Sequence, residues 1–287
     1  MNPSDHHQAT RRLTHRLGPN FSVGFRFLTP AKRRAVYAAY AACRVADDIV
    51  DEVPPGGDAD EARRALDAWQ DEVEAAYSGR PSEPATRALA DVLEHFPVPK
   101  EAFFGLIEGC RWDLVKHRYP DFAELEKYCE LVAVTISDIS LAIFGAERPE
   151  AHGYGRNLAM ALQLTNICRD VGEDIERDRV YLPMDELELC RVTVEDLYAR
   201  RAGEGFRELM ALQTERARGY FRAANPLPET VERDARLGVR LMGIIYARIL
   251  ECIAARPEAV LERRVALGRL ARYRVVAAGL LGRPFVA

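Results

Sequence analysis

Helix-forming segments follow one another along the chain with short connections between them, and this succession limits the fold more than any other feature of the sequence. Apolar residues recur three and four positions apart within each segment, and the segments end at prolines or glycines. One segment begins after Thr29-Pro30, a capping residue followed by a first-turn proline, and ends at Pro54-Pro55-Gly56-Gly57. No stretch is a convincing β-strand. The pattern therefore predicts an all-α fold.

The predicted helices cover residues 31–53, 59–78, 83–96, 99–116, 122–144, 154–176, 184–190, 194–201, 204–224, 229–255 and 257–281. No linker of ten or more Gly, Ser or Pro residues separates them, and no repeat recurs at a solenoid period. We therefore expect a single all-helical domain over residues 1–287.

The composition argues against several classes of protein. With 287 residues, 48% hydrophobic and 29% charged, the chain resembles an ordinary globular protein with a sizeable core. A net charge of −4 argues against nucleic acid as a partner. The six cysteines form no CxxC pair, and most lie in apolar helical patterns, which indicates a reducing, cytoplasmic location. The longest apolar run near the C-terminus, residues 275–281, is too short to span a bilayer.

An acidic cluster ends the first of these helices. In the stretch ACRVADDIVDE, residues 42–52, four carboxylates lie within six residues at the end of an alanine-rich segment. Like charges at helical spacing repel one another and destabilise a helix. A solvated helix end is the simpler interpretation when only one such cluster is considered.

A second cluster of the same form favours a different interpretation. The stretch NICRDVGED, residues 166–174, also ends an apolar helix with carboxylates. Asp47 and Asp51 are four residues apart, as are Asp170 and Asp174, so each pair projects from one face of its helix. If the two faces meet, four carboxylates converge, and Mg²⁺ is typically held by carboxylates, waters and the phosphates of a substrate. The spacing predicts a diphosphate bound through magnesium.

Arginines and aromatic residues accompany both clusters. Arg44 and Arg169 lie beside the acidic pairs and Arg179 follows the second, where their charge could neutralise a departing diphosphate. Alternatively, Arg44 and Arg169 only balance charge on their own helices. A departing diphosphate leaves a carbocation, which aromatic faces stabilise. The aromatic residues near the clusters, each also explained by ordinary core packing, are Phe21, Phe25, Tyr37, Tyr40, Tyr128 and Tyr246.

These motifs resemble the squalene/phytoene synthase family, whose members join two prenyl diphosphates head to head. The resemblance rests on YAACRVADDIVD (residues 40–51), on Tyr128-Cys129 with Val132-Ala133, and above all on QLTNICRDVGED (residues 163–174) continuing into RVYLP (residues 179–183). It covers roughly residues 21–270. It implies an isoprenoid-synthase-type helical bundle around a central hydrophobic cavity, prenyl diphosphate substrates and Mg²⁺.

The resemblance also implies a role for each matching residue. The residues implied to bind Mg²⁺ are Asp47, Asp51, Asn166, Asp170 and Asp174. Those implied to bind the substrate are Asn20, Phe21, Phe25, Arg44, Asn166, Arg169, Arg179 and Arg264. Those implied in catalysis are Tyr40, Arg44, Tyr128, Arg169 and Tyr246. In the family's reaction, one diphosphate ionises, the second molecule's double bond attacks the cation, and the resulting cyclopropylcarbinyl (presqualene-type) diphosphate ionises in turn.

Several positions depart from the family pattern. Asn20 stands where many members have serine, and Val134 and Ser137 replace glycines, which narrows whatever that helix lines. Asp138 adds a charge that lies either at the surface or near the cavity. Phe25 stands where members that use farnesyl diphosphate tend to be bulky, so we expect two farnesyl units and a C30 product. A phytoene synthase acting on geranylgeranyl diphosphate remains the alternative, with Phe25 as helix packing.

Other functions stay open. A terpene cyclase would ionise and cyclise one diphosphate in a similar scaffold. The C-terminal segment, residues 261–287, carries six arginines against one acid among leucines and valines, a pattern typical of a basic amphipathic helix on a membrane surface. A noncatalytic membrane-binding protein would leave the acidic clusters unexplained, but an enzyme of this kind could associate peripherally with a membrane. No GxGxxG follows a strand, so the sequence does not decide whether NADPH takes part, nor does it give the oligomeric state.

Overall fold

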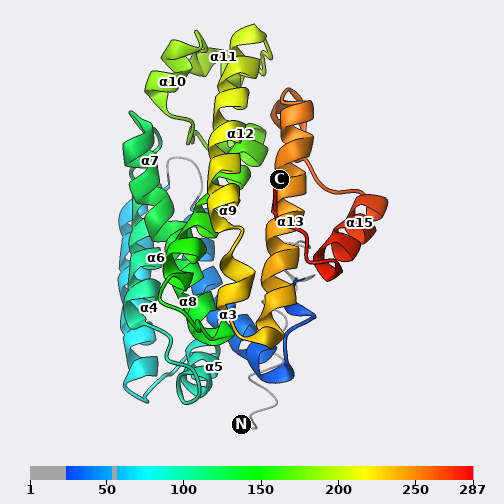
Figure 1. The fold of residues 1–287 in the computed structure, drawn as a ribbon. Helices are drawn as coiled ribbons and strands as arrows, with labels where there is room; N and C mark the ends of the chain where they lie inside the picture. The colour runs from blue at the N-terminus through cyan, green and yellow to red at the C-terminus, as the bar shows by residue number, and fades with distance from the viewer. Residues whose placement is uncertain (1–23, 54–56, 287) are drawn as a thin grey trace.

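The computed structural model describes residues 24–53 and 57–286, and this part of the chain forms a bundle of helices (Figure 1). It contains no β-strand, although two isolated bridges join Arg118 to Val180 and Ala146 to Val231. The all-α prediction is confirmed. The α-helices are α3 (Pro30–Asp51), α4 (Ala59–Tyr77), α5 (Pro84–Leu93), α6 (Lys100–Asp113), α7 (Phe122–Cys129), α8 (Thr135–Phe144), α9 (Ala151–Glu176), α10 (Met184–Leu189), α11 (Val194–Tyr198), α12 (Glu204–Ala224), α13 (Arg233–Ala255), α14 (Ala259–Glu262) and α15 (Arg269–Leu280).

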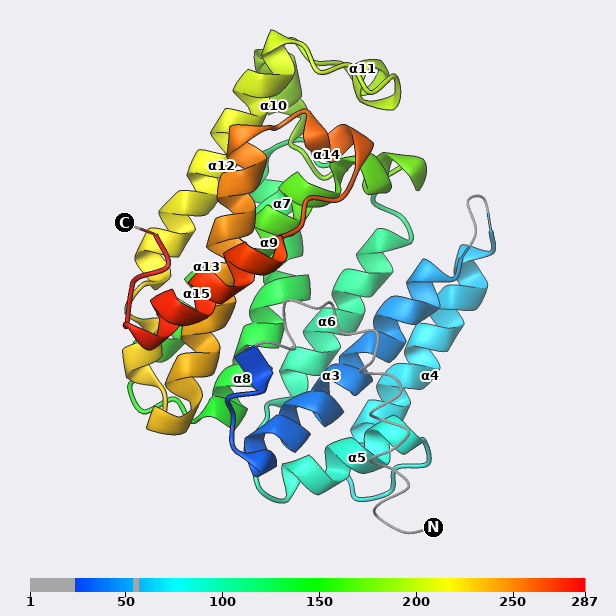
Figure 2. The same ribbon diagram turned by 90° about the vertical axis from the view of Figure 1, so that its right-hand side faces the viewer.

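The bundle has two groups of helices that share α8. α3 packs against α4, α5, α6 and α8, whereas α9 packs against α8, α12, α13 and α14. Figures 1 and 2 show α3, α4 and α6 on one side of the molecule and α12, α13 and α15 on the other. One cluster of buried side chains runs through both groups, from Phe25 to Phe285.

A π-helical turn interrupts the helix expected over residues 122–144. α7 ends at Cys129, the turn η1 covers Glu130–Val134, and α8 begins at Thr135. The wider turn presses Val132 against α6, where a Cβ added to Gly109 would lie 2.5 Å from Val132 Cγ1. Only glycine therefore fits at this point of α6 without a shift of its neighbour.

The prediction of one helix over residues 257–281 is wrong. α14 ends at Glu262, Arg263 is extended with φ −158° and ψ 155°, and α15 begins at Arg269. Leu261 and Leu267 are both buried, so apolar anchors hold the two ends of this α14–α15 connection against the core. The helix expected over residues 229–255 likewise begins later, because a 3₁₀ turn, η2 (Leu227–Thr230), precedes α13.

We expect Gly109→Ala to destabilise the fold by about 1–3 kcal/mol, because the new methyl group would overlap Val132. Adding Val132→Ala should recover part of that loss. Gly219 of α12 is the matched control: an added Cβ would meet nothing within 4 Å, so Gly219→Ala should gain about 0.5–1 kcal/mol from helix propensity. Urea unfolding measures all three free energies. A Gly109→Ala variant as stable as the wild type would contradict the close packing.

Candidate active site

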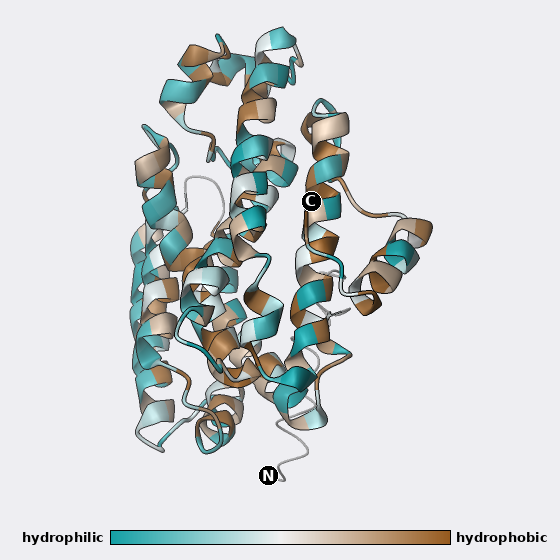
Figure 3. Ribbon diagram, viewed as in Figure 1, coloured by the Kyte–Doolittle hydropathy of each residue, from teal (hydrophilic) through white to brown (hydrophobic). Residues whose placement is uncertain are grey.

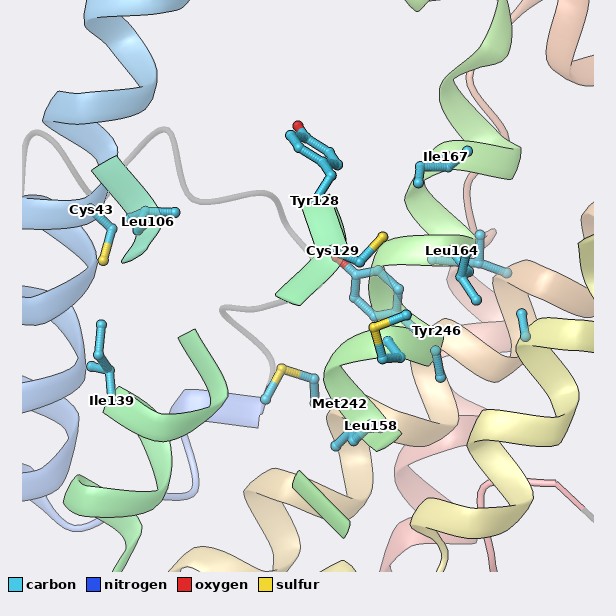
Figure 4. Close-up of a cluster of buried hydrophobic side chains, with 14 of the residues drawn as sticks. Cys43, Leu106, Tyr128, Cys129, Ile139, Leu158, Leu164, Ile167, Met242 and Tyr246 are labelled. Atoms are coloured by element: carbon cyan, nitrogen blue, oxygen red, sulfur yellow. The ribbon is translucent and has the colours of Figure 1, made fainter. Parts of the chain in front are cut away.

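An apolar cavity of about 260 Å³ lies inside the bundle. Side chains from α3, α6, α8, α9 and α13 surround it (Figure 4), namely Cys43, Leu106, Ile139, Leu158 and Met242. Most of the remaining lining residues are also apolar. The expected helical bundle with a central hydrophobic cavity is therefore confirmed.

Both acidic motifs reach the polar end of this cavity. Asp47 from α3 and Asn166 from α9 belong to its lining. Beside them, Arg177, the residue after α9, forms an ion pair with Asp51 at the end of α3, with Nη1 2.6 Å from Oδ1. These two residues are 126 positions apart in the chain, so the contact brings the two helix ends together.

Burial and mutual repulsion raise the pKa values of the carboxyl groups here. Burial raises the pKa of Asp47 to about 7, and the nearby Asp51 contributes to the rise. Burial, followed by the neighbouring Asp170, raises the pKa of Asp174 to about 8. Asp113, the last residue of α6, acts on both groups, and burial raises its own pKa. Carboxylates that repel one another in this way favour a bound cation.

Arginines partly neutralise these acids. Arg44 lies 2.6 Å from Asp48, between Nη2 and Oδ1, so it does balance charge on its own helix. The buried Arg169 likewise holds its neighbour Asp170 through two contacts, Nε–Oδ1 at 2.7 Å and Nη2–Oδ2 at 2.5 Å.

Two further arginines reach the site from other segments. Arg264, in the α14–α15 connection, approaches Asp170 with Nε 3.1 Å from Oδ1. Arg179 donates to the main-chain carbonyl of Asp113 at 3.4 Å. Since the expected helix would have continued through residue 264, the break after α14 is what allows Arg264 to face the second motif.

A polar cluster of tyrosines stands beside the carboxylates. Tyr128 and Tyr181 both donate to Asp113, at 2.9 and 2.8 Å, and their rings stack with centroids 5.2 Å apart. Tyr246 is buried near Arg169. Of the three tyrosines expected to face cations, Tyr40 is in the cavity lining, whereas Tyr128 and Tyr246 are not.

Sequence reasoning missed three of these residues. Asp113 has no acidic neighbour three or four positions away, so no spacing marks it. Arg177 lies three residues after Asp174 and belongs to neither motif, and Tyr181 lies within RVYLP, where the sequence pattern indicates no role for it. Their positions follow from the end of α6 meeting the segment after α9.

The departures from the family pattern fall in different places. Phe25 lines the cavity and also packs edge-on against Tyr37, with ring centroids 6.1 Å apart, so it is both cavity wall and helix packing. Ser137 lines the cavity, and Val134 packs against the core. Asp138 pairs with the exposed His152 at 3.4 Å, which places it at the surface. Asn20 and Phe21 lie outside the described residues.

The polar end of the cavity fits a magnesium diphosphate. Within residues 24–53 and 57–286, no three acidic, histidine or cysteine side chains lie close enough together to hold a metal ion. However, two buried atoms of the motif residues lack a hydrogen-bond partner: the acceptor Asn166 Oδ1 and the donor Arg44 Nε. Carboxylate and amide oxygens suit Mg²⁺, and a guanidinium donor suits phosphate. To bind the metal, Asp51 and Asp170 would exchange arginine contacts for the cation.

Comparison with known proteins assigns the family. A model of squalene/phytoene synthase matches residues 14–271. The chain belongs to this family. The 15-cis-phytoene synthase of Synechocystis sp. is 37% identical over 270 residues, which cover 90% of this chain and 79% of that protein. The phytoene synthase of Arthrospira platensis is 36% identical over 274 residues, which cover 91% and 88%.

Solved structures agree with this assignment. The squalene synthase HpnC from Alicyclobacillus acidocaldarius is 31% identical, with a TM-score of 0.75 over 98% of this chain and 95% of that one. A dehydrosqualene synthase solved with a ligand has a TM-score of 0.88 over 97% and 96% at 24% identity, which shows the shared fold. The chain is thus a prenyltransferase of the squalene/phytoene synthase type.

Repulsion among the carboxylates predicts how stability depends on pH without metal. The pKa values of Asp47 and Asp174 are raised in the fold, so between about pH 4 and pH 8 the folded chain binds more protons than the unfolded one. Stability should therefore fall as the pH rises through this window. In EDTA at about pH 8.5, Asp174→Asn should be more stable than the wild type, by on the order of 1 kcal/mol after solvent screening.

The gain should shrink towards about pH 4, where the wild-type carboxyl group is protonated as well. Urea unfolding at both pH values measures it, with Asp71→Asn on the exposed side of α4 as the control that should leave the pH dependence unchanged. An Asp174→Asn variant that is less stable than the wild type at the higher pH would mean that Asp174 is held by stabilising contacts.

Proposed function

We propose that this chain condenses two geranylgeranyl diphosphates head to head to phytoene and releases diphosphate. The observation that carries this proposal is the meeting of both motif helices at the polar end of an apolar cavity, marked by the Asp51–Arg177 ion pair. The choice of the C20 substrate is supported by the names of the relatives, which are phytoene synthases at 36–37% identity.

The arginines of the site would hold the diphosphates. Arg44 and Arg169 already lie against the motif carboxylates, and the buried Nε of Arg44 has no hydrogen-bond partner. Arg179 contacts the main-chain carbonyl of Asp113, and Arg264 contacts Asp170. Fixed cationic donors of this kind stabilise negative charge as it develops on a leaving group, which lowers the barrier to ionisation.

Magnesium would complete this charge balance. Asp47, Asp51, Asn166, Asp170 and Asp174 would hold it, and when bound it would supply the positive charge that neutralises the diphosphate. In its absence, the same carboxylates repel the substrate's phosphates. A cation would therefore have to bind at the polar end of the cavity before the diphosphate can ionise.

The cavity would protect the cations. Its walls are mostly apolar, including Leu106, Ile139 and Met242, and such walls would limit the access of water to the carbon that becomes positive. Tyr40 stands at the boundary between the wall and the acidic end, where burial raises its pKa to about 12 and keeps it a neutral phenol. A neutral aromatic ring can stabilise a cation through its face without being consumed by it.

A C30 product from farnesyl diphosphate is the second candidate. It is favoured by the ring of Phe25 on the cavity wall and by the likeness to squalene synthase HpnC. The two candidates differ by one isoprene unit in each substrate, so they make different predictions for the same cavity.

Turnover of the C15 and C20 diphosphates with Mg²⁺, with and without NADPH, separates the two candidates. We expect the wild type to convert the C20 substrate to a C40 product with the higher kcat/KM, without a need for NADPH. Phe25→Ala should raise the C20 over C15 preference further, by about tenfold, because the lost ring makes room for the longer chain. Exclusive formation of a C30 product by the wild type would reject the C20 proposal.

Phe103→Ala is the matched control for Phe25→Ala. Phe103 is a buried phenylalanine of α6 with its own edge-on partner, Tyr77, at 6.5 Å between centroids, and it lies outside the cavity lining. Both variants should lose about 3–5 kcal/mol of stability, but only Phe25→Ala should change the product ratio. Equal C40-to-C30 product ratios in the two variants would mean that Phe25 serves only in packing.

A further inference from the structure

The outward face of α15 is apolar, which is unusual for a helix at the edge of a bundle. Leu270, Tyr273, Leu280 and Leu281 are 77%, 74%, 65% and 72% exposed. Together with the exposed Ala277, they follow the three- and four-residue spacing of one helix face. Figure 3 shows brown, hydrophobic residues along this helix at the edge of the molecule. A contiguous exposed apolar patch marks an interaction surface.

The opposite face of α15 is already satisfied. Val275 is buried, and a Cβ added to Gly279 would lie 2.6 Å from Leu241 Cδ2 of α13. α15 therefore packs closely on α13 through its small residues. The face of α15 that meets the core is therefore already packed, and the exposed leucines on the other face are open to a partner.

An arginine-lined groove adjoins the apolar face. Arg248 of α13 with Arg274 and Arg283 line a groove of about 450 Å³, whose other lining residues are alanines, a valine and Leu281. No acidic residue lines it. Residues 263–287 contain six arginines and no acid, although the whole chain carries a net charge of −4. Three arginines and no acid thus line this groove, in contrast to the negative net charge of the whole chain.

We infer that the outer face of α15 and the adjoining groove form a docking surface for an anionic phospholipid bilayer, the apolar side chains entering the lipid and the arginines binding headgroup phosphates. Apolar residues flanked by arginines are the pattern of interfacial helices. Within the described part of the chain, no helix has the length and apolarity to cross a bilayer, so this contact would be peripheral.

The surface is linked to the acidic site by a short path. The α14–α15 connection places Arg264 against Asp170. Buried Leu267 lies in the same connection, two residues before α15 begins. A bilayer held by α15 would therefore lie near the segment that contacts the second motif. Substrates with long prenyl chains dissolve in lipid, so such docking would bring the enzyme to them, a benefit that rests on the proposed function.

Co-sedimentation with vesicles tests the docking surface in the absence of any prenyl diphosphate, so its result is independent of the proposed function. The probes are vesicles of phosphatidylcholine alone and of phosphatidylcholine mixed with phosphatidylglycerol. Wild-type protein should sediment with the mixed vesicles and should not sediment with the vesicles of phosphatidylcholine alone. The double variant Leu270→Asp, Leu280→Asp should bind more than tenfold more weakly. Arg274→Ala with Arg283→Ala should weaken binding about 30-fold, at about fivefold per arginine.

Two matched controls lie on other helices. Leu189→Asp changes a leucine of α10 that is 75% exposed, and Arg64→Ala changes an exposed arginine of α4, across the molecule from α15 (Figure 1). Both should bind like the wild type. Absence of wild-type binding, equal binding to neutral vesicles, or unchanged binding by both double variants would overturn the proposal. So would a wild-type dimer in light scattering that Leu270→Asp, Leu280→Asp converts to a monomer, because the face would then be a protein interface.

Discussion

Repulsion among carboxylates that lie together at the polar end of an apolar cavity is the constraint on which the candidate site depends. Burial and acidic neighbours raise the pKa values of Asp47 and Asp174, so their ionised forms are unfavourable in the fold. A bound cation would stabilise those ionised forms. The helices must also approach closely enough for their ends to meet. α3 does so with a buried face of alanines, including Ala38, Ala42 and Ala46, and this explains why an alanine-rich segment precedes the first acidic motif. Small side chains bring the backbones together, and the carboxylates then converge where the helices end.

Arginines contact the carboxylates at one end of the cavity, and apolar side chains line the rest of it. Asp170 is held by Arg169 from its own helix and by Arg264 from the α14–α15 connection, so guanidinium groups contact both of its carboxylate oxygens. In the proposed function, the same guanidinium groups would donate to phosphate oxygens once a cation binds the carboxylates. The cavity beyond them is lined mainly by apolar side chains, which in the proposed reaction would limit the access of water to a carbocation. The proposed charge separation would thus be stabilised at one end and protected at the other.

The sequence predicted those features that lie within single helices. The i,i+4 pairs Asp47/Asp51 and Asp170/Asp174 need only helical geometry, so both motifs and the all-α fold were recognised from spacing. The Asp51–Arg177 contact and the position of Asp113 arise where α6, α9 and the following segment meet, and no local pattern encodes such a meeting. The C-terminal helix was expected to be continuous because its apolar periodicity continues. The structure breaks it at Arg263, since buried Leu261 and Leu267 anchor the chain to the core on either side. The basic amphipathic pattern expected over residues 261–287 includes an apolar face, and the structure turns such a face of α15 outward.

Calorimetric titration of Mg²⁺ in the presence of inorganic diphosphate tests most directly whether the two helix ends form one site. Asp51→Asn, Asp170→Asn and the double variant make a double-mutant cycle between residues of α3 and α9. If both carboxylates hold the same bound group, the two single losses in affinity will not add, and the interaction energy will be about 1 kcal/mol or more. Additive losses within about 0.5 kcal/mol, or magnesium affinity unchanged by either substitution, would show that the two motifs act independently and would contradict the account.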